Sequence, residues 1–113
     1  MLNWCQNTLI ITNNSNEKIL KFFENNKNKE DTLDFNCLIE LPEELEYNKI
    51  LDEDKRKELK EKYNYNNPKD WCLNNWGTIW NAADTVYAIS TNEIIYSFET
   101  AWVPPIMWLN KLI

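Results

Sequence analysis

Two strand-like segments separated by only two residues constrain the fold of this chain most. Thr85–Ser90 and Glu93–Phe98 are rich in β-branched and aromatic side chains, and Thr91-Asn92 is the whole connection between them. So short a connection can join antiparallel neighbours but not parallel ones, which need a crossover of a dozen or more residues. The sequence therefore predicts an antiparallel hairpin.

The N-terminal part predicts a strand followed by a helix. Cys5–Thr12 ends in a β-branched run, which is typical of a strand. Asn14 or Ser15 can cap the helix that follows, because their side-chain oxygens can accept the free N–H groups of its first turn. Four apolar side chains then share one broad helix face: Ile19, Leu20, Phe22 and Phe23.

A further strand and a surface helix are predicted between residues 33 and 63. Leu33–Leu41 first alternates and then becomes continuously apolar, which favours a strand ending at Pro42. Asp52–Tyr63 carries acids first and bases later, an order that the helix dipole favours. Leu59 and Tyr63 are its only strong apolar anchors, so we expect a solvated helix that is loosely attached.

Tryptophan is concentrated in the C-terminal part of the chain. Trp71 follows the polar stretch Pro68–Asp70, and Trp108 lies on a helix, Ile106–Leu112, that begins after Pro104-Pro105. We therefore expect these two rings to be exposed and able to anchor a partner. The other indoles are expected to close the core, since each ring buries a large apolar area: Trp4, Trp76, Trp80 and Trp102.

Two residue types that serve many active sites are almost missing. The absence of histidine removes the commonest general base, the commonest metal ligand and any Ser-His or Cys-His dyad. The single glycine, Gly77, cannot form a glycine-rich phosphate loop, and we expect it to meet a positive φ or a close backbone approach. The paired carboxylates lie in hydrophilic sequence, where nothing apolar raises a pKa. We expect no catalytic residue, no cofactor and no enzyme.

The three cysteines are expected to be structural thiols. Cys5 and Cys37 lie on predicted strands and resemble small buried hydrophobes, and no C-x-x-C pair includes Cys72. With Asp70 or Asp84 these thiols make a poor metal site, because structural zinc usually has closely spaced pairs of Cys or His ligands. No apolar leader and no membrane span is recognisable, so we expect a cytoplasmic protein of the host cell without a membrane partner.

The net charge of −6 is concentrated in one segment. Between Glu40 and Asp54 lie seven acids and one base, Lys49, while the rest of the chain is neutral overall. Direct binding of nucleic acid is disfavoured, because it needs clustered positive charge. The segment is either a solubilising loop or a surface that imitates nucleic acid and presents its negative charge to a basic groove of a partner. In the second interpretation its acids contact the partner, together with Trp71 and Trp108: Glu43, Glu44, Glu46, Asp52, Glu53 and Asp54.

Three motifs stand out in order: N-W-C-Q-N at Asn3–Asn7, N-N-W-G-T-I-W-N at Asn74–Asn81, and F-E-T-A-W-V-P-P at Phe98–Pro105. Together they resemble the Api92-like family, also called the YubB ferredoxin-like domain, which phages, plasmids and other mobile elements carry. The resemblance reaches from Met1 to about Pro105. It implies a ferredoxin-like α+β sandwich, an antiparallel sheet with helices on one face, and no enzymatic activity or cofactor.

The chain is expected to form a single domain over residues 1–113, with a helix-containing insertion near residues 43–80. It departs from the family at Leu2, where the family usually has proline, and by stopping at Ile113, where the family typically continues into a further strand. A missing strand would leave an edge with unpaired N–H and C=O groups, which a partner's strand can use.

These observations predict a non-catalytic interaction protein from a phage or other mobile element. Its expected partner is a host protein or ribonucleoprotein that processes nucleic acid, such as a CRISPR effector, which it would inhibit through its acidic surface. One alternative is a single-stranded nucleic-acid-binding module, in which Tyr87, Tyr96 and Phe98 stack on bases. Another is a homodimer or larger homo-oligomer formed through an open sheet edge.

Overall fold

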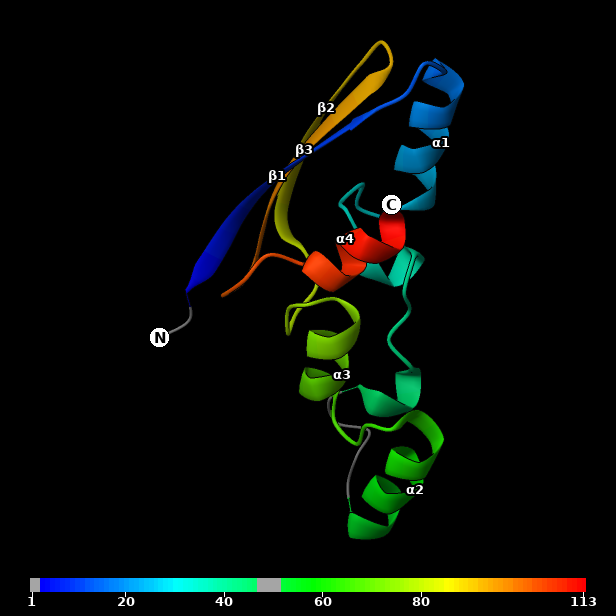
Figure 1. Cartoon of the computed structure of the whole chain (residues 1–113), viewed down its shortest axis with the longest axis vertical. Coiled ribbons are helices and arrows are strands. Elements are labelled where there is room, and N and C mark those ends of the chain that lie inside the picture. The colour runs from blue at the N-terminus through cyan, green and yellow to red at the C-terminus, as the bar shows by residue number, and fades with distance from the viewer. Residues whose placement is uncertain (1–2, 47–51) are drawn as a thin grey trace.

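The predicted hairpin forms two strands of the sheet, with β3 at the centre and β2 at one edge. In the computed structural model, which describes residues 3–46 and 52–113, β2 (Ala83–Ser90) and β3 (Glu93–Ala101) pair antiparallel. β1 (Trp4–Thr12) pairs antiparallel with the other side of β3, so the strand order is β1-β3-β2 (Figure 1). The α+β class and the antiparallel sheet are confirmed.

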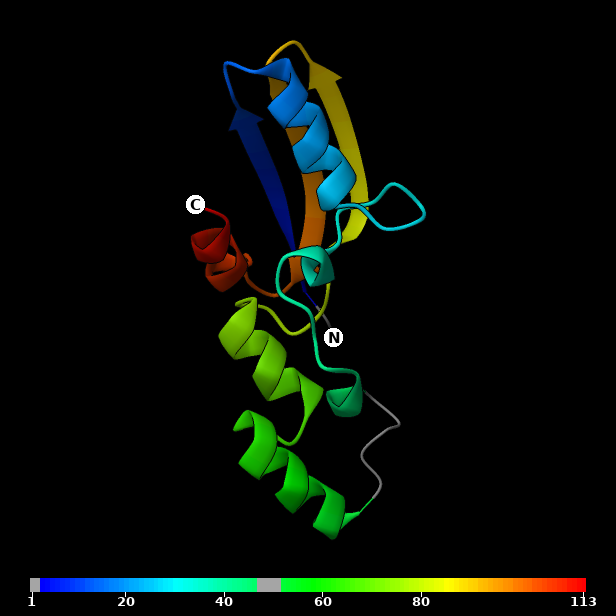
Figure 2. The ribbon, with the colours of Figure 1, turned by 90° about the vertical axis from the view of Figure 1, so that its right-hand side faces the viewer.

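The helices divide between one face of the sheet and one end of the molecule. α1 (Asn16–Asn25) covers one face, while α2 (Glu53–Tyr63) and α3 (Pro68–Asn75) extend away from the sheet (Figures 1 and 2). The molecule is consequently elongated, with extents of 52 × 31 × 24 Å. Two short 3-10 helices and a last α-helix complete the fold: η1 (Phe35–Cys37), η2 (Glu43–Leu45) and α4 (Ile106–Leu112).

Local signals in the sequence place α1 correctly. The Ser15 hydroxyl accepts the N–H of Lys18 at 3.3 Å and caps the helix. Ile19 and Phe23 face the sheet and are buried, whereas Leu20 points to solvent. The side chains of β3 on the face of the sheet that α1 covers are all buried: Ile94, Tyr96, Phe98 and Thr100.

The strand predicted at Leu33–Leu41 is wrong. η1 occupies its middle, and only an isolated bridge joins Lys27 to Leu33. Asp34 caps η1 by accepting the Asn36 N–H at 3.0 Å, and the Phe35 N–H donates to the Asn81 side chain at 2.9 Å. These side chains accept hydrogen bonds from backbone N–H groups of the segment. The apolar residues of Leu33–Leu41 can therefore be buried without the hydrogen bonds of a β-sheet.

Most predictions of tryptophan exposure are reversed. Trp108 is 0% and Trp71 7% exposed, whereas Trp4 is 45%, Trp80 41% and Trp102 56% exposed; Trp76 alone among the four expected core rings is buried. α4 folds back onto the core, where the Trp108 N–H donates to the Trp76 carbonyl at 3.0 Å. Trp108 and Trp71 therefore cannot anchor a partner in this structure.

Gly77 has both features expected from the sequence, a positive φ and a close backbone approach. Its φ is +92°, and a Cβ atom there would lie 2.9 Å from the Ile106 nitrogen and 3.0 Å from the Met107 nitrogen. The turn after α3 therefore touches the start of α4 backbone to backbone.

The helix-containing insertion is present. α2 and α3 lie within residues 43–80, and α2 is anchored by Leu59, which is buried, and Tyr63, which is half-buried. Residues 47–51 of the acidic connector, including Lys49, lie outside the described residues. No helix in the described part of the chain is long and apolar enough to cross a membrane.

Candidate interaction surface

The three sequence motifs meet at one end of the sheet. The Thr78 hydroxyl donates to the Ala101 carbonyl at 2.8 Å, and the Trp102 N–H donates to the Asn3 carbonyl at 2.8 Å. The rings of Trp4 and Trp80 are in tilted contact, with centroids 6.0 Å apart. These contacts bring segments that are far apart in the sequence together and leave exposed indoles at this end of the sheet.

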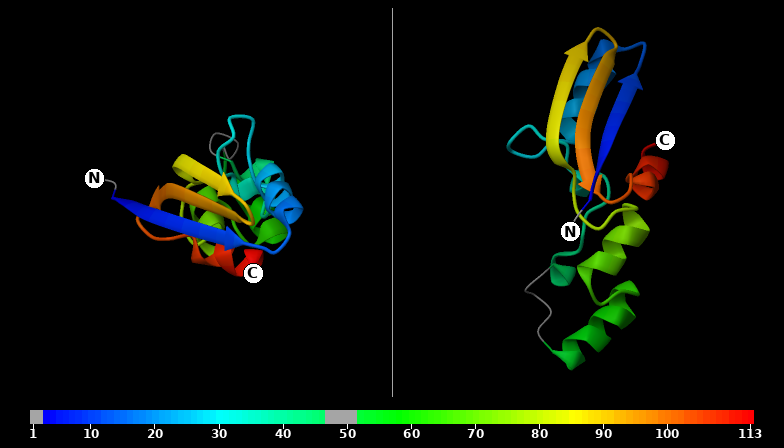
Figure 3. Two further views of the ribbon diagram at one scale, coloured as in Figure 1. Left: turned by 90° about the horizontal axis from the view of Figure 1, so that it is seen from above. Right: turned by 90° about the vertical axis from the view of Figure 1, so that its left-hand side faces the viewer.

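Within the described residues, no helix lies over the face of the sheet opposite α1, and Figure 3 (right) shows this face toward the viewer. Strand register places every second side chain on this face. We call it the bare face and define it by these strand residues: Trp4, Gln6, Thr8, Ile10, Thr12, Val86, Ala88, Ser90, Glu93, Ile95, Ser97 and Glu99. None of them carries a positive charge.

Two carboxyl groups meet beside the exposed tryptophans. Asp84 lies at the irregular start of β2, with φ of +48°, and its carboxyl interacts with that of Glu99. Desolvation is the main reason why the pKa of Glu99 is raised, and the hydrogen bond and repulsion from Asp84 add to it. A cation placed here would relieve that repulsion. Sequence reasoning missed this pair, because only the strand register brings the two residues together.

The predicted acidic contacts lie at the α2 end of the molecule, around η2 and the start of α2 (Figure 1). Glu44 pairs with Lys62 at 3.0 Å and with Lys55 at 3.8 Å, and the hydrogen bond from Lys62 is the main cause of the lowered pKa of Glu44. Asp52 caps α2 by accepting the Lys55 N–H at 2.7 Å, and Glu53 pairs with Arg56 at 3.5 Å. Half of the six acids therefore hold this helix in place.

The remaining predicted acids are exposed: Glu43, Glu46 and Asp54. The described residues of α2 and its cap contain as many bases as acids, namely Lys55, Arg56, Lys57, Lys60 and Lys62 against Asp52, Glu53, Asp54, Glu58 and Glu61. The bases of α2 therefore balance the acids of α2 and its cap, but not the acids that precede them: Glu40, Glu43, Glu44 and Glu46.

The aromatic residues of the nucleic-acid alternative lie on the wrong face of the sheet. Tyr96 and Phe98 are buried, and Tyr87 packs on Phe23 with ring centroids 4.6 Å apart. The rings of Tyr96 and Phe98 belong to the core and are not available to stack on bases, and the partly exposed ring of Tyr87 lies on the face of the sheet that α1 covers.

Two of the three thiols have raised pKa values. Cys72 is buried, and desolvation raises its pKa to about 12, so the thiol stays protonated at neutral pH. Desolvation also raises the pKa of Cys37, which is exposed and not buried as expected, because the strand that was to bury it does not form. Cys5 is half-buried. Among residues 3–46 and 52–113, no three His, Cys, Asp or Glu side chains cluster as metal ligands would.

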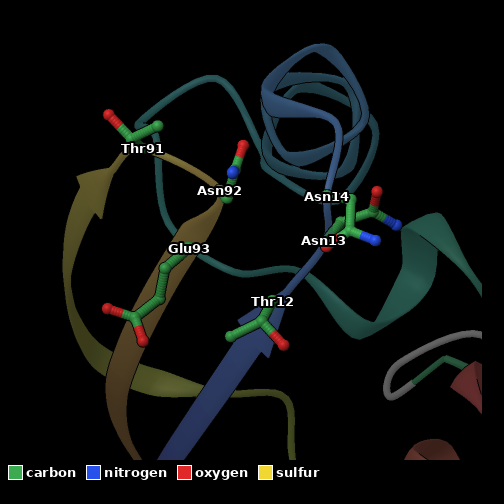
Figure 4. A pocket seen from close by; sticks show the side chains of 6 residues that line it. All are labelled: Thr12, Asn13, Asn14, Thr91, Asn92 and Glu93. Atoms are coloured by element: carbon green, nitrogen blue, oxygen red, sulfur yellow. The ribbon is translucent and has the colours of Figure 1, made fainter.

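A polar depression lies where β1 ends beside the β2–β3 turn (Figure 4). It is lined by Thr12, Asn13, Asn14, Thr91, Asn92 and Glu93. Their side chains point in different directions and do not converge on a common centre (Figure 4). The depression contains one titratable group, Glu93, and no acid–base pair, so the bare face is the stronger candidate.

Comparisons with known proteins add no assignment. No family model matches the sequence, and neither a curated protein nor a solved structure matches it. The resemblance to the Api92-like family stays a prediction that rests on the three motifs.

Proposed function

We propose that this chain is a non-catalytic interaction protein of a phage or other mobile element that binds a positively charged surface of a host protein. One observation carries the proposal. The bare face presents Trp4, which is in contact with Trp80, and Glu99, whose carboxyl group interacts with that of Asp84 at the start of β2, and none of the residues of the bare face is cationic.

Tryptophan and carboxylate together are suited to an arginine-bearing partner. A guanidinium group can stack on an indole ring and at the same time pair with a carboxylate. Two aliphatic side chains further along the bare face, Ile10 and Val86, are exposed and can be desolvated by the same partner. Aromatic anchors surrounded by weaker contacts are the usual arrangement of a binding hot spot.

The target class that fits best is a nucleic-acid-processing effector, since such proteins carry arginine-rich grooves. We propose an inhibitory, anti-CRISPR-like role in which this acidic protein occupies the groove. The exposed acids near α2, Glu43, Glu46 and Asp54, stay predicted as a second contact region that speeds association electrostatically.

We further propose that the fold is a ferredoxin-like sandwich. The antiparallel order β1-β3-β2, with α1 between β1 and β2 and α4 after β3, is consistent with the first three strands and both helices of that fold. A bare sheet face is a natural outcome of this architecture, because both helices lie on the other side.

Charge reversal on the bare face tests the proposed function. Immobilised protein is expected to capture a basic, nucleic-acid-processing protein from host lysate, identified by mass spectrometry. Glu99→Lys is expected to lower this capture about tenfold or more, because it places a like charge before an arginine-bearing surface. The matched control Glu30→Lys makes the same change at an exposed position in the loop after α1, outside both proposed contact regions, and is expected to keep capture. Equal capture by both variants would contradict the assignment of the bare face.

The carboxyl pair predicts an unusual pH dependence of stability. Because folding raises the pKa of Glu99, its contribution to stability is full below its ordinary pKa and is lost as the pH rises through its folded pKa. Above its folded pKa, Glu99 therefore carries a charge that its surroundings in the folded protein disfavour. Glu99→Gln is expected to raise Tm at about pH 7 and to change it little at about pH 4. Circular dichroism melts across this range check the result, with Glu61→Gln as the control; equal shifts in both variants would refute the prediction.

A further inference from the structure

β1 is an edge strand whose outward hydrogen-bonding groups can be identified. The Asn13 N–H donates to the Asn92 carbonyl at 3.0 Å, and the Trp102 N–H donates to the Asn3 carbonyl at 2.8 Å. Both belong to the continuous β1–β3 register, so odd-numbered residues of β1 bond to β3. The N–H and C=O groups of Thr8, Ile10 and Thr12 consequently point away from β3, where no strand of the described residues pairs with them.

This edge lacks the usual protection against strand pairing. Asn3–Asn16 contains no charged side chain and no proline, and the β1–β3 register is free of bulges. The opposite edge of the sheet, β2, is irregular between Ala83 and Val86 and carries the charge of Asp84. Proteins commonly protect edge strands with charges, prolines or bulges. The edge at β2 is therefore protected against pairing with a further strand, whereas the edge at β1 is not.

An apolar groove runs beside the same edge. It is lined by Leu9, Ile10, Ile11, Thr12, Phe22, Leu109, Leu112 and Ile113, none of which is charged. Figure 2 shows α4 beyond β1, on the side of the strand that faces away from β3. A strand added to β1 would therefore pack its side chains between β1 and α4.

We propose that β1 pairs antiparallel with β1 of a second copy of this chain, about a two-fold axis at Ile10, and forms a six-stranded sheet. The groove lies at residues 9–12 of β1, which favours this register over one centred nearer Trp4. It places Leu9 opposite Ile11 of the second copy on the groove side. Ile10 meets Ile10 of the second copy on the bare face, and Thr8 meets Thr12 of the second copy.

The symmetry of the strand favours a second copy as the occupant, and charge determines where two copies can meet. A chain with a net charge of −6 repels its own copies over most of its surface. The side chains along the edge of β1 and in the groove are uncharged, so these side chains do not oppose like charges when two copies meet there. The strand is also self-complementary in this register, since apolar residues meet apolar residues and threonine meets threonine, as a two-fold interface requires.

The dimer would join two bare faces on the same side of one continuous sheet. Each copy's carboxyl pair and exposed tryptophans would then be presented together, which would raise the avidity for a partner with repeated basic sites. The pairing itself requires no such partner, so it can be tested on purified protein and independently of the proposed target.

Sedimentation velocity from low micromolar to near-millimolar concentration tests the proposal. The unmodified chain is expected to shift from monomer to dimer. Ile10→Lys is expected to raise the dissociation constant of the dimer about tenfold or more, because two lysines would face each other across the axis. The matched control Val86→Lys adds the same charge at an exposed apolar position on the far strand of the bare face and is expected to dimerise normally. A monomer at every concentration, or a dimer that Ile10→Lys leaves intact, overturns the proposal.

Amide hydrogen exchange gives a second, residue-specific readout. The N–H groups of Thr8, Ile10 and Thr12 are expected to exchange rapidly at low concentration and at least tenfold more slowly in the dimer. The N–H groups of Leu9 and Ile11 bond to β3 and are expected to be protected at both concentrations. Protection of the three outward amides that does not depend on concentration overturns the proposal, because another part of the same chain would then cover the edge.

Discussion

Replacing Trp108 by alanine is expected to lower the free energy of unfolding by about 3–5 kcal/mol, the usual loss for a large aromatic side chain in a core. The indole is fully buried and packs on Phe35, with ring centroids 4.9 Å apart. Its removal would leave a cavity between α4 and the sheet and would loosen the contact of α4 with Trp76. Urea unfolding followed by circular dichroism gives the value.

Trp102→Ala is the control for this experiment. Trp102 is also an indole near the end of the sheet, but it is mostly exposed, so its loss is expected to change stability by only about 0.5 kcal/mol. Trp108→Phe keeps most of the packing and removes an indole N–H that has no hydrogen-bond partner, so a folded variant is expected even if Trp108→Ala is too unstable. A larger loss for Trp102→Ala than for Trp108→Ala would show that α4 does not dock as described.

Gly77→Ala is expected to cost roughly 2–4 kcal/mol, from a positive φ that alanine adopts poorly and from overpacking against α4. The added Cβ would press on backbone nitrogen atoms of Ile106 and Met107, which cannot rotate away as the end of a side chain can. The start of α4 would have to shift, and this shift would weaken the hydrogen bond from the backbone N–H of Trp108 to the Trp76 carbonyl. Thermal and urea unfolding measure the loss.

Asn92→Ala separates the two causes. Asn92 also has a positive φ, +64°, but it lies in the β2–β3 turn, away from α4. Its replacement is expected to cost only the conformational part, about 1 kcal/mol. If Gly77→Ala costs no more than Asn92→Ala, the close approach between the α3 turn and α4 is not a constraint on this position.

Elements with strong local signals were predictable from the sequence. The hairpin around Thr91-Asn92, the strand of β1, the Ser15 cap of α1 and the start of α4 after Pro104-Pro105 are all confirmed. In each case neighbouring residues supply the deciding interaction: a turn too short for any other pairing, a side-chain cap or a fixed φ.

The prediction of a strand at Leu33–Leu41 was wrong because a residue far along the chain supplies the deciding interaction. Its apolar pattern is compatible with a strand, but Asn81, far along the chain, accepts the Phe35 N–H and also donates from its side-chain amide to the Asp34 carboxylate at 2.8 Å. Periodicity indicates that such a segment is buried and does not indicate which groups satisfy its backbone. The same limit applies to the pairing of Asp84 with Glu99.

Tryptophan exposure shows most clearly where local reasoning ends. Polar neighbours made Trp71 seem exposed, although α3 turns its ring into edge contact with Trp76, with centroids 5.6 Å apart. Trp4 seemed to belong to the core, although strand alternation turns it to the face that no helix covers. The orientation of a side chain is local, but its burial depends on what packs against that side.

Sequence alone was enough to predict an antiparallel α+β chain, because turns and caps act within a few residues. Only the packed molecule decided which tryptophans are exposed, which carboxyl groups repel each other and which strand edge of the described residues stays open. Those properties arise where residues separated by most of the chain length meet, since burial and electrostatic coupling depend on distance in space and not on distance along the backbone.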